Sequence, residues 1–192
     1  MPFDPAIEWS IGAAWLTFLL YWLVRSFGVK RTVKRQSLVS RVAQIGGGGV
    51  VIFLLFDGRV RWAWLTSRFI PPGFAWAAAG AAITWAGVAL AIWARTILGA
   101  NWSGTVTLKE GHTLIRDGPY AVVRHPIYSG LLLAALGTAV ALNQIRGLLA
   151  VVAAFLILVS KYRIEERFMT ERFGSEYEAY RRHTRALIPF VF

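Results

Sequence analysis

The sequence predicts an all-α integral membrane protein with about five transmembrane helices, and three observations lead to that fold class. Of the 192 residues, 56% are hydrophobic and only 16% are charged, which is too apolar for an ordinary soluble surface. Five long runs contain no charged residue. The formal net charge of +11 comes from basic residues that lie between these runs, as expected for membrane helices flanked by Lys and Arg.

The uncharged runs are the expected membrane helices. A bilayer core needs about 20 apolar residues per helix. The third and fourth runs reach that length, and the others need Arg or Lys side chains at their ends that extend to the headgroups. In chain order, the runs are Trp9–Val24 (16 residues), Val42–Phe56 (15), Phe74–Ala94 (21), Ile127–Ile145 (19) and Gly147–Ser160 (14).

The distribution of basic residues predicts how this integral membrane protein is oriented: the N-terminus lies outside and the C-terminus lies in the cytoplasm. With that orientation, the inner segments hold 17 Lys and Arg residues and the outer segments hold four. This excess on the inner side follows the positive-inside rule. The same residues would contact anionic membrane lipids, so we expect membrane lipids as partners and no nucleic acid.

The chain is within the usual size of one domain, and residues 1–192 are expected to form a single membrane domain. Residues 1–94 would supply three N-terminal helices, and residues 95–192 would be the catalytic part, with helices four and five and a C-terminal tail. Polar residues concentrate in the 95–126 loop and in the C-terminal helical segment, both on the inner side. We therefore expect a cytoplasmic cofactor site there, and because the chain has no cysteine, we expect no thiolate metal site.

The 111–130 segment, GHTLIRDGPYAVVRHPIYSG, is dense in turn formers, aromatic rings and titratable groups. Its Asp117-Gly118-Pro119 sequence predicts a turn, because Gly accepts a positive φ and Pro fixes its own φ. Pro126 fits the first position of the fourth membrane helix, where its missing N–H costs nothing.

The start of this helix predicts an anion site. Its free N–H groups and dipole, together with Arg124 and His125, would bind a carboxylate or a phosphate. Tyr120 and Tyr128 add aromatic faces that can stack on a base or attract a cation such as a sulfonium. For Arg124-His125-Pro126 taken alone, the alternative is purely structural: a helix start with an Arg that extends to the headgroups and a capping His.

A second polar segment follows the fifth run. Lys161 and Glu165 are four residues apart and share one helix face, whereas Glu166 is rotated by about 100°, so only one of the two acids is expected to face the site. Gly174 would end this helix, and Ser175 with Glu178 predicts a capping box that opens a last short helix. That turn would bring Tyr177 and Tyr180 back to the site.

In chain order, these motifs form a combined pattern. It consists of His112-x-Leu114, Gly118-Pro119-Tyr120, Arg124-His125-Pro126-x-Tyr128-x-Gly130, Glu165-Glu166, Phe173-Gly174-x-x-Tyr177 and Tyr180. The pattern resembles the isoprenylcysteine carboxyl methyltransferase family, which comprises small integral membrane methyltransferases that use S-adenosyl-L-methionine. That family shares the RHPxYxG and EE elements with phospholipid N-methyltransferases. The first three helices match only as generic membrane spans.

The resemblance implies a cofactor site and a substrate site. Lys161 occupies the position of a basic group for a substrate carboxylate, and Arg163 is its rival for that role. A carboxylate acceptor would need no general base, because it is already ionised at neutral pH, so we name no catalytic acid or base. Residues expected to bind the cofactor are His112, Thr113, Leu114, Ile115, Tyr120, His125, Pro126, Ile127, Tyr128 and Glu165, with Arg124 added through the predicted anion site.

The sequence thus favours S-adenosylmethionine-dependent methyl transfer to a lipophilic small molecule or lipidated substrate, most like carboxyl O-methylation of an isoprenylcysteine. Three alternatives remain open: a phospholipid, amine or thiol methyltransferase on the same scaffold, an NADPH-dependent membrane reductase, and a non-catalytic membrane protein. The identity of the cofactor would separate these classes. The sequence does not indicate an oligomeric state.

Overall fold

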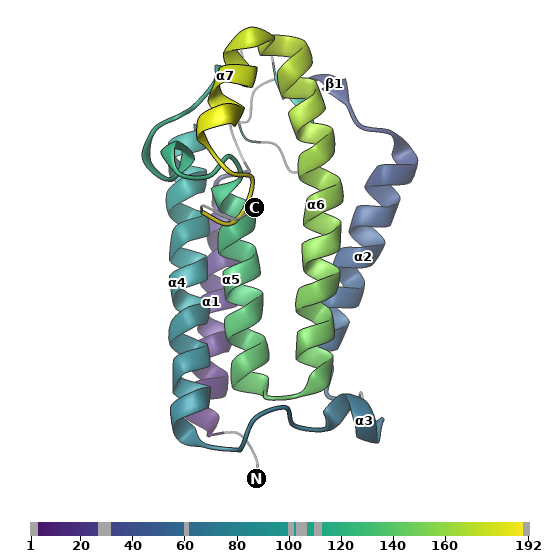
Figure 1. The fold of residues 1–192 in the computed structure, drawn as a ribbon. Coiled ribbons are helices and arrows are strands. Elements are labelled where there is room, and N and C mark those ends of the chain that lie inside the picture. The colour runs from purple at the N-terminus through teal and green to yellow at the C-terminus, as the bar shows by residue number, and fades with distance from the viewer. Residues whose placement is uncertain are drawn as a thin grey trace.

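The computed structural model describes residues 4–26, 32–59, 62–99, 102, 107–109 and 113–189. In this part of the chain, five long helices run alternately up and down (Figure 1), and each predicted run overlaps one of them, which confirms the predicted fold class. The helices are α1 Pro5–Val24, α2 Leu38–Phe56, α4 Phe74–Leu98, α5 Pro126–Leu142 and α6 Ile145–Phe173.

Four of these helices, α1, α2, α4 and α6, are long and apolar enough to cross a membrane. The fifth, α5, is apolar and has 17 residues, which at 1.5 Å per residue is roughly 26 Å. In contrast, α6 has 29 residues and spans roughly 43 Å, longer than a bilayer core of about 30 Å. The end of α6 that follows Ser160 therefore extends beyond the apolar layer.

The predicted end of the fourth membrane helix was wrong. The fourth run was expected to be helical to Ile145, but α5 ends at Leu142, because Asn143 adopts a left-handed conformation with φ of 48°. The Asn143 side chain holds this turn by two hydrogen bonds with the Ile70 backbone, accepting from its N–H (3.1 Å) and donating to its carbonyl (2.9 Å). The polar segment after the fifth run was expected to be helical up to Gly174, and this is confirmed, because α6 continues through these residues to Phe173 with Gly174 as its C-cap residue.

The smaller elements lie near the ends of the bundle. A short helix, α3 (Ala63–Thr66), lies at the end near the N-terminus (Figure 1). At the opposite end are the 3-10 helix η2 (Gly118–Ala121) and α7 (Ser175–His183). The sequence predicted no strand, yet β1 (Thr32–Arg35) pairs antiparallel with β2 (Thr107–Lys109). This pairing ties the α1–α2 connection to the α4–α5 connection.

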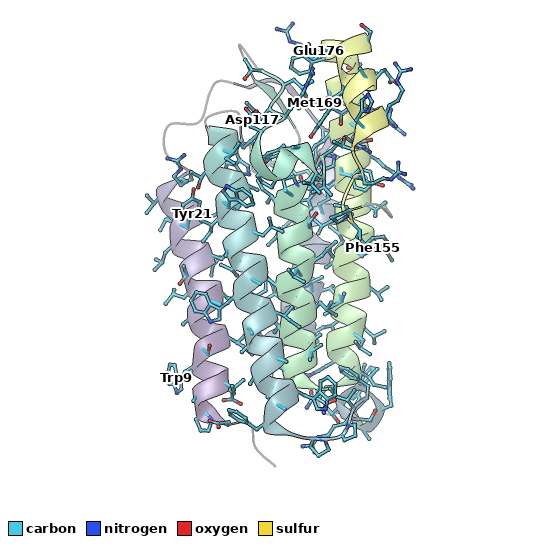
Figure 2. The ribbon with its side chains drawn as sticks, turned by 60° about the vertical axis from the view of Figure 1, so that its left-hand side comes forward. Trp9, Tyr21, Asp117, Phe155, Met169 and Glu176 are labelled. Atoms are coloured by element: carbon cyan, nitrogen blue, oxygen red, sulfur yellow. The ribbon has the colours of Figure 1, made fainter. Side chains whose placement is uncertain are left out.

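The alternating topology gathers the polar connections at one end of the molecule. The α1–α2 connection, the α4–α5 connection and the end of α6 with α7 all lie there (Figure 1). Figure 2 shows the same division along the bundle: Trp9 lies near the opposite end, whereas Asp117, Met169 and Glu176 lie at the polar end. The two polar segments predicted to form the site are therefore on the same side of the bundle.

The closest helix contact is between α4 and α5, and it depends on glycine. A Cβ atom at Gly87 would lie 2.3 Å from the backbone nitrogen of Ala134, and one at Gly130 would lie 2.6 Å from the carbonyl oxygen of Gly87. Further along the same two helices, Gly80 and Gly137 make an equally close backbone contact. Helices in membranes approach closely through such small residues. Gly130, the last residue of the RHPxYxG motif, is therefore a packing residue.

Replacing Gly87 by alanine is expected to destabilise the fold by about 1–3 kcal/mol, because the added methyl group forces α4 and α5 apart. Thermal unfolding of the detergent-solubilised protein would measure this loss. A matched control is Gly48→Ala in α2, where an added Cβ meets nothing within 4 Å. The control should be neutral or stabilising by up to about 1 kcal/mol. Equal losses in both variants would contradict the role given to the α4–α5 contact.

Candidate functional site

The start of α5 is held by the segment that follows α7. Pro126 is the first residue of α5, as predicted, and His125 is its N-cap residue. The Arg124 N–H donates to the Arg185 carbonyl (2.8 Å), and the His125 N–H donates to the Ala186 carbonyl (3.0 Å). The C-terminal segment therefore lies beside the residues before α5 and fixes the backbone from which His125 projects.

The imidazole of His125 lies between two carboxylates of α6. Its Nδ1 is 3.4 Å from Glu165 Oε2, and its Nε2 is 3.3 Å from Glu166 Oε1. The prediction that only one of the two acids faces the site was therefore wrong. Adjacent helix residues do diverge by about 100°, but the imidazole offers a nitrogen on each side, so each flexible Glu side chain reaches its own nitrogen.

This arrangement favours a protonated imidazole. Burial of His125 opposes the charged form, but the interactions with Glu165 and Glu166 outweigh it, and the pKa of His125 is raised above its usual value. Two carboxylates next to one imidazole thus keep a positive charge inside the protein.

Glu166 also binds two arginines. Arg124 Nε is 2.6 Å from Glu166 Oε1, and both side chains are only 10% exposed. Arg181 Nε lies 3.6 Å from the other carboxylate oxygen. Arg124 donates in addition to the backbone carbonyls of Thr184 and Arg181. Arg124, which we placed in an anion site, is thus bound to a carboxylate of the protein itself.

Aromatic rings form one wall of the site. The His125 ring stacks on the Tyr128 ring with 5.5 Å between centroids and 5° between planes, and Tyr162 lies 5.2 Å away on a tilted plane. The Tyr128 hydroxyl donates to Glu165 Oε1 (2.5 Å). Lys161 Nζ lies 5.3 Å from the Tyr128 ring centroid, so a cation already lies over this ring.

Tyr162 was not among the predicted site residues. A signal was available, because Tyr162 precedes Glu166 by four residues and therefore shares its helix face. Its ring belongs to the buried cluster that also contains Tyr128, Ile127 and Leu158. Tyr162 is therefore both a member of the buried apolar cluster and a contact of the His125 ring.

Tyr120 is a buried residue that links η2 to α4 and α7 by hydrogen bonds. It is 6% exposed, and its hydroxyl donates to the Ala94 carbonyl at 3.4 Å. The Tyr180 hydroxyl donates to the Tyr120 carbonyl (2.6 Å), and Tyr177 is buried beside Tyr180. The return of Tyr177 and Tyr180 to the site is therefore confirmed, and α7 is anchored to η2.

The predicted capping box at the start of α7 is absent. Gly174, with φ of 52°, is both the C-cap residue of α6 and the N-cap residue of α7. Ser175 is consequently already the first helical residue, and no side chain caps α7. The sharp turn at a single glycine leaves no residue free to act as a separate cap.

The remaining residues that were predicted to bind the cofactor differ in how far they are buried. Thr113 is exposed and Leu114 is half-buried, while Ile115 packs against the buried cluster around Tyr120. Pro126 and Ile127 are buried at the start of α5. His112 lies outside the described residues.

Of the two candidates for the substrate carboxylate, Lys161 lies at the Tyr128 ring whereas Arg163 is exposed. The structure thus brings together His125, Tyr128, Lys161 and Glu165. Among the described residues there is no group of three or more His, Asp or Glu side chains that could hold a metal.

The fold and the site define a class of polytopic helical membrane proteins with a polar, aromatic-lined site at one end of the bundle. The chain belongs to the phospholipid methyltransferase family, whose model matches residues 75–176. The matched region contains all of α5 and α6, which carry the site.

Relatives of this chain confirm the resemblance drawn from its motifs. It is 33% identical over 84 residues to protein-S-isoprenylcysteine O-methyltransferase B of Arabidopsis thaliana, a match that covers 43% of each chain. It is 35% identical over 96 residues to the protein-S-isoprenylcysteine O-methyltransferase of Schizosaccharomyces pombe, covering 48% of this chain and 41% of the yeast protein. The matched segments span less than half the length of these relatives.

A solved structure shows the same fold. The eukaryotic intramembrane Ras methyltransferase, isoprenylcysteine carboxyl methyltransferase, superposes with a TM-score of 0.56 over 83% of this chain and 55% of that protein. The identity is 23%, so this likeness concerns the arrangement of helices alone.

Replacement of Glu166 by glutamine is expected to cost about 3 kcal/mol of stability, because it leaves Arg124 and the imidazolium of His125 without their shared carboxylate. Thermal unfolding in detergent would measure the loss. The matched control is Glu178→Gln, which removes an exposed partner 3.5 Å from Arg181 and should change stability by at most about 1 kcal/mol. A Glu166 variant as stable as this control would show that the network is dispensable.

The raised pKa of His125 also predicts a pH dependence of stability. A group whose pKa is higher in the folded protein stabilises the fold fully below its unfolded pKa of about 6.5, and this contribution is lost as the pH rises through the folded value. The unfolding temperature should therefore fall between neutral and alkaline pH, and His125→Gln should flatten that slope. His183→Gln, at an exposed position, should keep it. An unchanged slope in the His125 variant would contradict the assignment.

Proposed function

We propose that this chain catalyses S-adenosylmethionine-dependent methyl transfer to a lipophilic acceptor at the membrane, namely carboxyl O-methylation of an isoprenylcysteine-type substrate. The observation that carries the proposal is the cluster of His125, Tyr128, Glu165 and Lys161, which combines a cation-binding ring, a carboxylate and an ammonium group at one end of a membrane bundle. The names of the relatives support the acceptor.

The residues present fit the chemical groups of S-adenosylmethionine. Bound in the site, this cofactor supplies a methyl group made electrophilic by a positively charged sulfur. The Tyr128 ring, over which an ammonium already lies at 5.3 Å, is suited to a cation, and Glu165 is suited to an amine. Thr113, Leu114 and Ile115 would complete the pocket on the η2 side.

The chain's own residues would mainly position and desolvate the reactants. Lys161, whose ammonium group lies over the Tyr128 ring, would orient a substrate carboxylate there. The Tyr128 hydroxyl and His125 fix Glu165 in place, and the buried aromatic cluster keeps water away. Because a carboxylate acceptor is ionised at neutral pH, none of these residues has to remove a proton from it.

A second candidate is an amine acceptor, such as the headgroup of a phospholipid, and the match to the phospholipid methyltransferase family favours it. An amine must lose a proton during methylation, so this reaction needs a proton acceptor. Glu165 is the carboxylate of the site that could take that role, although two neighbours already bind it.

The membrane orientation forms part of the proposal. The N-terminus would lie outside, with the active site and the C-terminus in the cytoplasm, because the polar end of the bundle collects the basic connections. All of the proposed site residues lie in the 95–192 part, which supports its assignment as the catalytic part of a single domain.

Titration calorimetry of the detergent-purified protein with S-adenosylhomocysteine tests the proposal, with NADPH as the parallel ligand. We expect saturable binding of S-adenosylhomocysteine alone. His125→Ala should weaken it at least about tenfold, because the ring that stacks on Tyr128 and fixes Glu165 is lost. Lys161→Ala should leave this affinity unchanged and lower turnover of a prenylcysteine carboxylate substrate.

Each other outcome has a distinct meaning. Binding of NADPH alone would identify a reductase, and binding of neither ligand by folded protein would favour a non-catalytic membrane protein. If Lys161→Ala weakens S-adenosylhomocysteine as much as His125→Ala does, the division between cofactor and substrate residues is wrong. Turnover of a phospholipid amine, with no turnover of the prenylcysteine carboxylate, would select the second candidate.

A further inference from the structure

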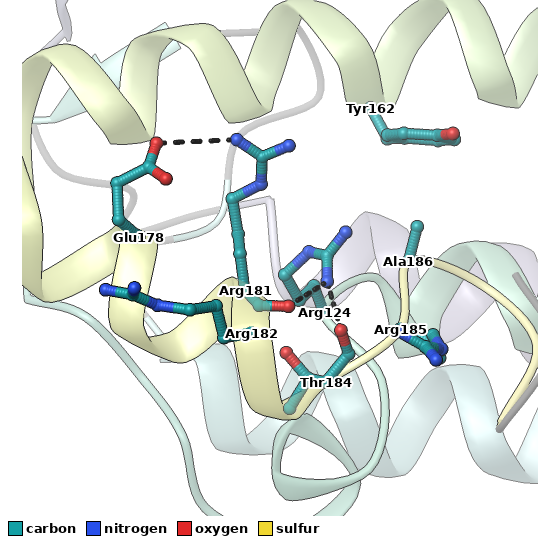
Figure 3. A pocket seen from close by; sticks show the side chains of 8 residues that line it. All are labelled: Arg124, Tyr162, Glu178, Arg181, Arg182, Thr184, Arg185 and Ala186. Atoms are coloured by element: carbon teal, nitrogen blue, oxygen red, sulfur yellow. Dashed lines mark hydrogen bonds and ion pairs between the residues drawn. The ribbon is translucent and has the colours of Figure 1, made fainter.

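A polar cavity opens beside the proposed methyltransferase site. It has a volume of about 420 Å³ and lies between α6, α7 and the segment after α7 (Figure 3). Four arginines, Arg124, Arg181, Arg182 and Arg185, line it, together with Glu178. A volume of this size can hold a phosphate-bearing headgroup.

The charges around this arginine pocket do not balance. Four guanidinium groups face two carboxylates, Glu178 in the lining and Glu166 behind it. Arg124 and Arg181 are bound to these two acids. Within the part of the chain that the structure describes, the guanidinium groups of Arg182 and Arg185 form no ion pair or hydrogen bond. Two positive charges are therefore available to an anion.

The pocket lies at the level where the apolar part of the bundle begins. Arg185 is paired by its backbone with Val123, three residues before α5 starts at Pro126. Arginines at this depth lie among lipid headgroups, and basic pockets between helices on the inner side bind anionic headgroups. The chain after Arg185 turns apolar, with Leu187 buried and Ile188 46% exposed.

An apolar path leads from the pocket along α6. Tyr162 lines the pocket, and Val159, Phe155 and Val152 follow at intervals of three or four residues on the same side of the helix. Phe155 and Val159 are partly buried, and Val152 is 55% exposed. Figure 2 places Phe155 below the polar end that carries Met169 and Glu176. This path can accommodate an acyl chain.

We propose that the arginine pocket binds the phosphate of an anionic phospholipid, whose acyl chains lie along α6. The guanidinium groups that line the pocket bind the phosphate oxygens, and the apolar path takes a chain. The proposal does not depend on the methyltransferase function. Guanidinium groups suit phosphate because they present several donors in one plane. The shared chemistry of the ligand is a phosphate anion, and the membrane leaflet is its source.

Native mass spectrometry of the detergent-solubilised full chain, titrated with phosphatidylglycerol, tests this site. Phosphatidylcholine is the parallel lipid, because it has the same phosphodiester but no net charge. We expect phosphatidylglycerol to bind more tightly. Each juxtamembrane arginine contributes about fivefold, so Arg182→Gln with Arg185→Gln should weaken phosphatidylglycerol by about 25-fold.

The matched control is Arg167→Gln with Arg172→Gln. It removes the same charge from exposed positions on α6 that do not line the pocket, and it should leave phosphatidylglycerol binding within about twofold. A loss as large as that of the pocket variant would overturn the proposal, because it would show a diffuse attraction of the whole basic end. Equal affinities for the two lipids would overturn it as well.

Two further arms distinguish the source of the anion. Inorganic phosphate at about 10 mM should not displace the lipid, because it lacks an acyl chain for the α6 path; displacement would show a site for free phosphate and overturn the lipid assignment. S-adenosylhomocysteine affinity should be the same in the pocket variant and the wild type. If the pocket variant loses affinity for S-adenosylhomocysteine and keeps its affinity for the lipid, the pocket belongs to the cofactor site and the lipid proposal fails. The methyltransferase proposal would stand in that case.

Discussion

The pairing of His125 with Glu165 and Glu166 is the interaction on which the rest of the site depends. One imidazole joins two carboxylates of α6 to the first turn of α5, and Arg124 joins the second carboxylate to the C-terminal segment. Positive and negative groups are buried here in pairs, so removing one of them would leave its partner as an unpaired buried charge. Three parts of the chain that are far apart in sequence are thereby held in one geometry.

This pairing needs a rigid frame below it, and α4 and α5 provide that frame. Gly87 and Gly130 let the two backbones touch, so α5 cannot shift or rotate against α4 without a clash. The length of α6 is equally important. Because α6 continues past the apolar layer as a helix, Glu165 and Glu166 stand at the height of the α5 start, where His125 can reach both.

The arginine pocket is a consequence of the same frame. The segment after α7 runs beside Val123 because its backbone pairs there, and this brings Arg185 next to Arg124. Glu166 binds Arg124 and Arg181. The other two arginines of the pocket, Arg182 and Arg185, therefore stay available to an anion from outside the protein. One side of the network is therefore aromatic and suited to an organic cation, whereas the other side is basic and suited to an anion.

The sequence by itself determined the number and order of the long helices, the start of α5 at Pro126 and the gathering of the polar segments at one end, because these follow from apolar length and local backbone chemistry. Only the tertiary structure decided the end of α5, the contacts of Glu166, Arg124 and Tyr162, and the β1–β2 pair. Asn143 stops its helix by binding Ile70, which lies 73 positions away. Contacts of this range depend on how the helices pack, and helical periodicity contains no information about the partner helix.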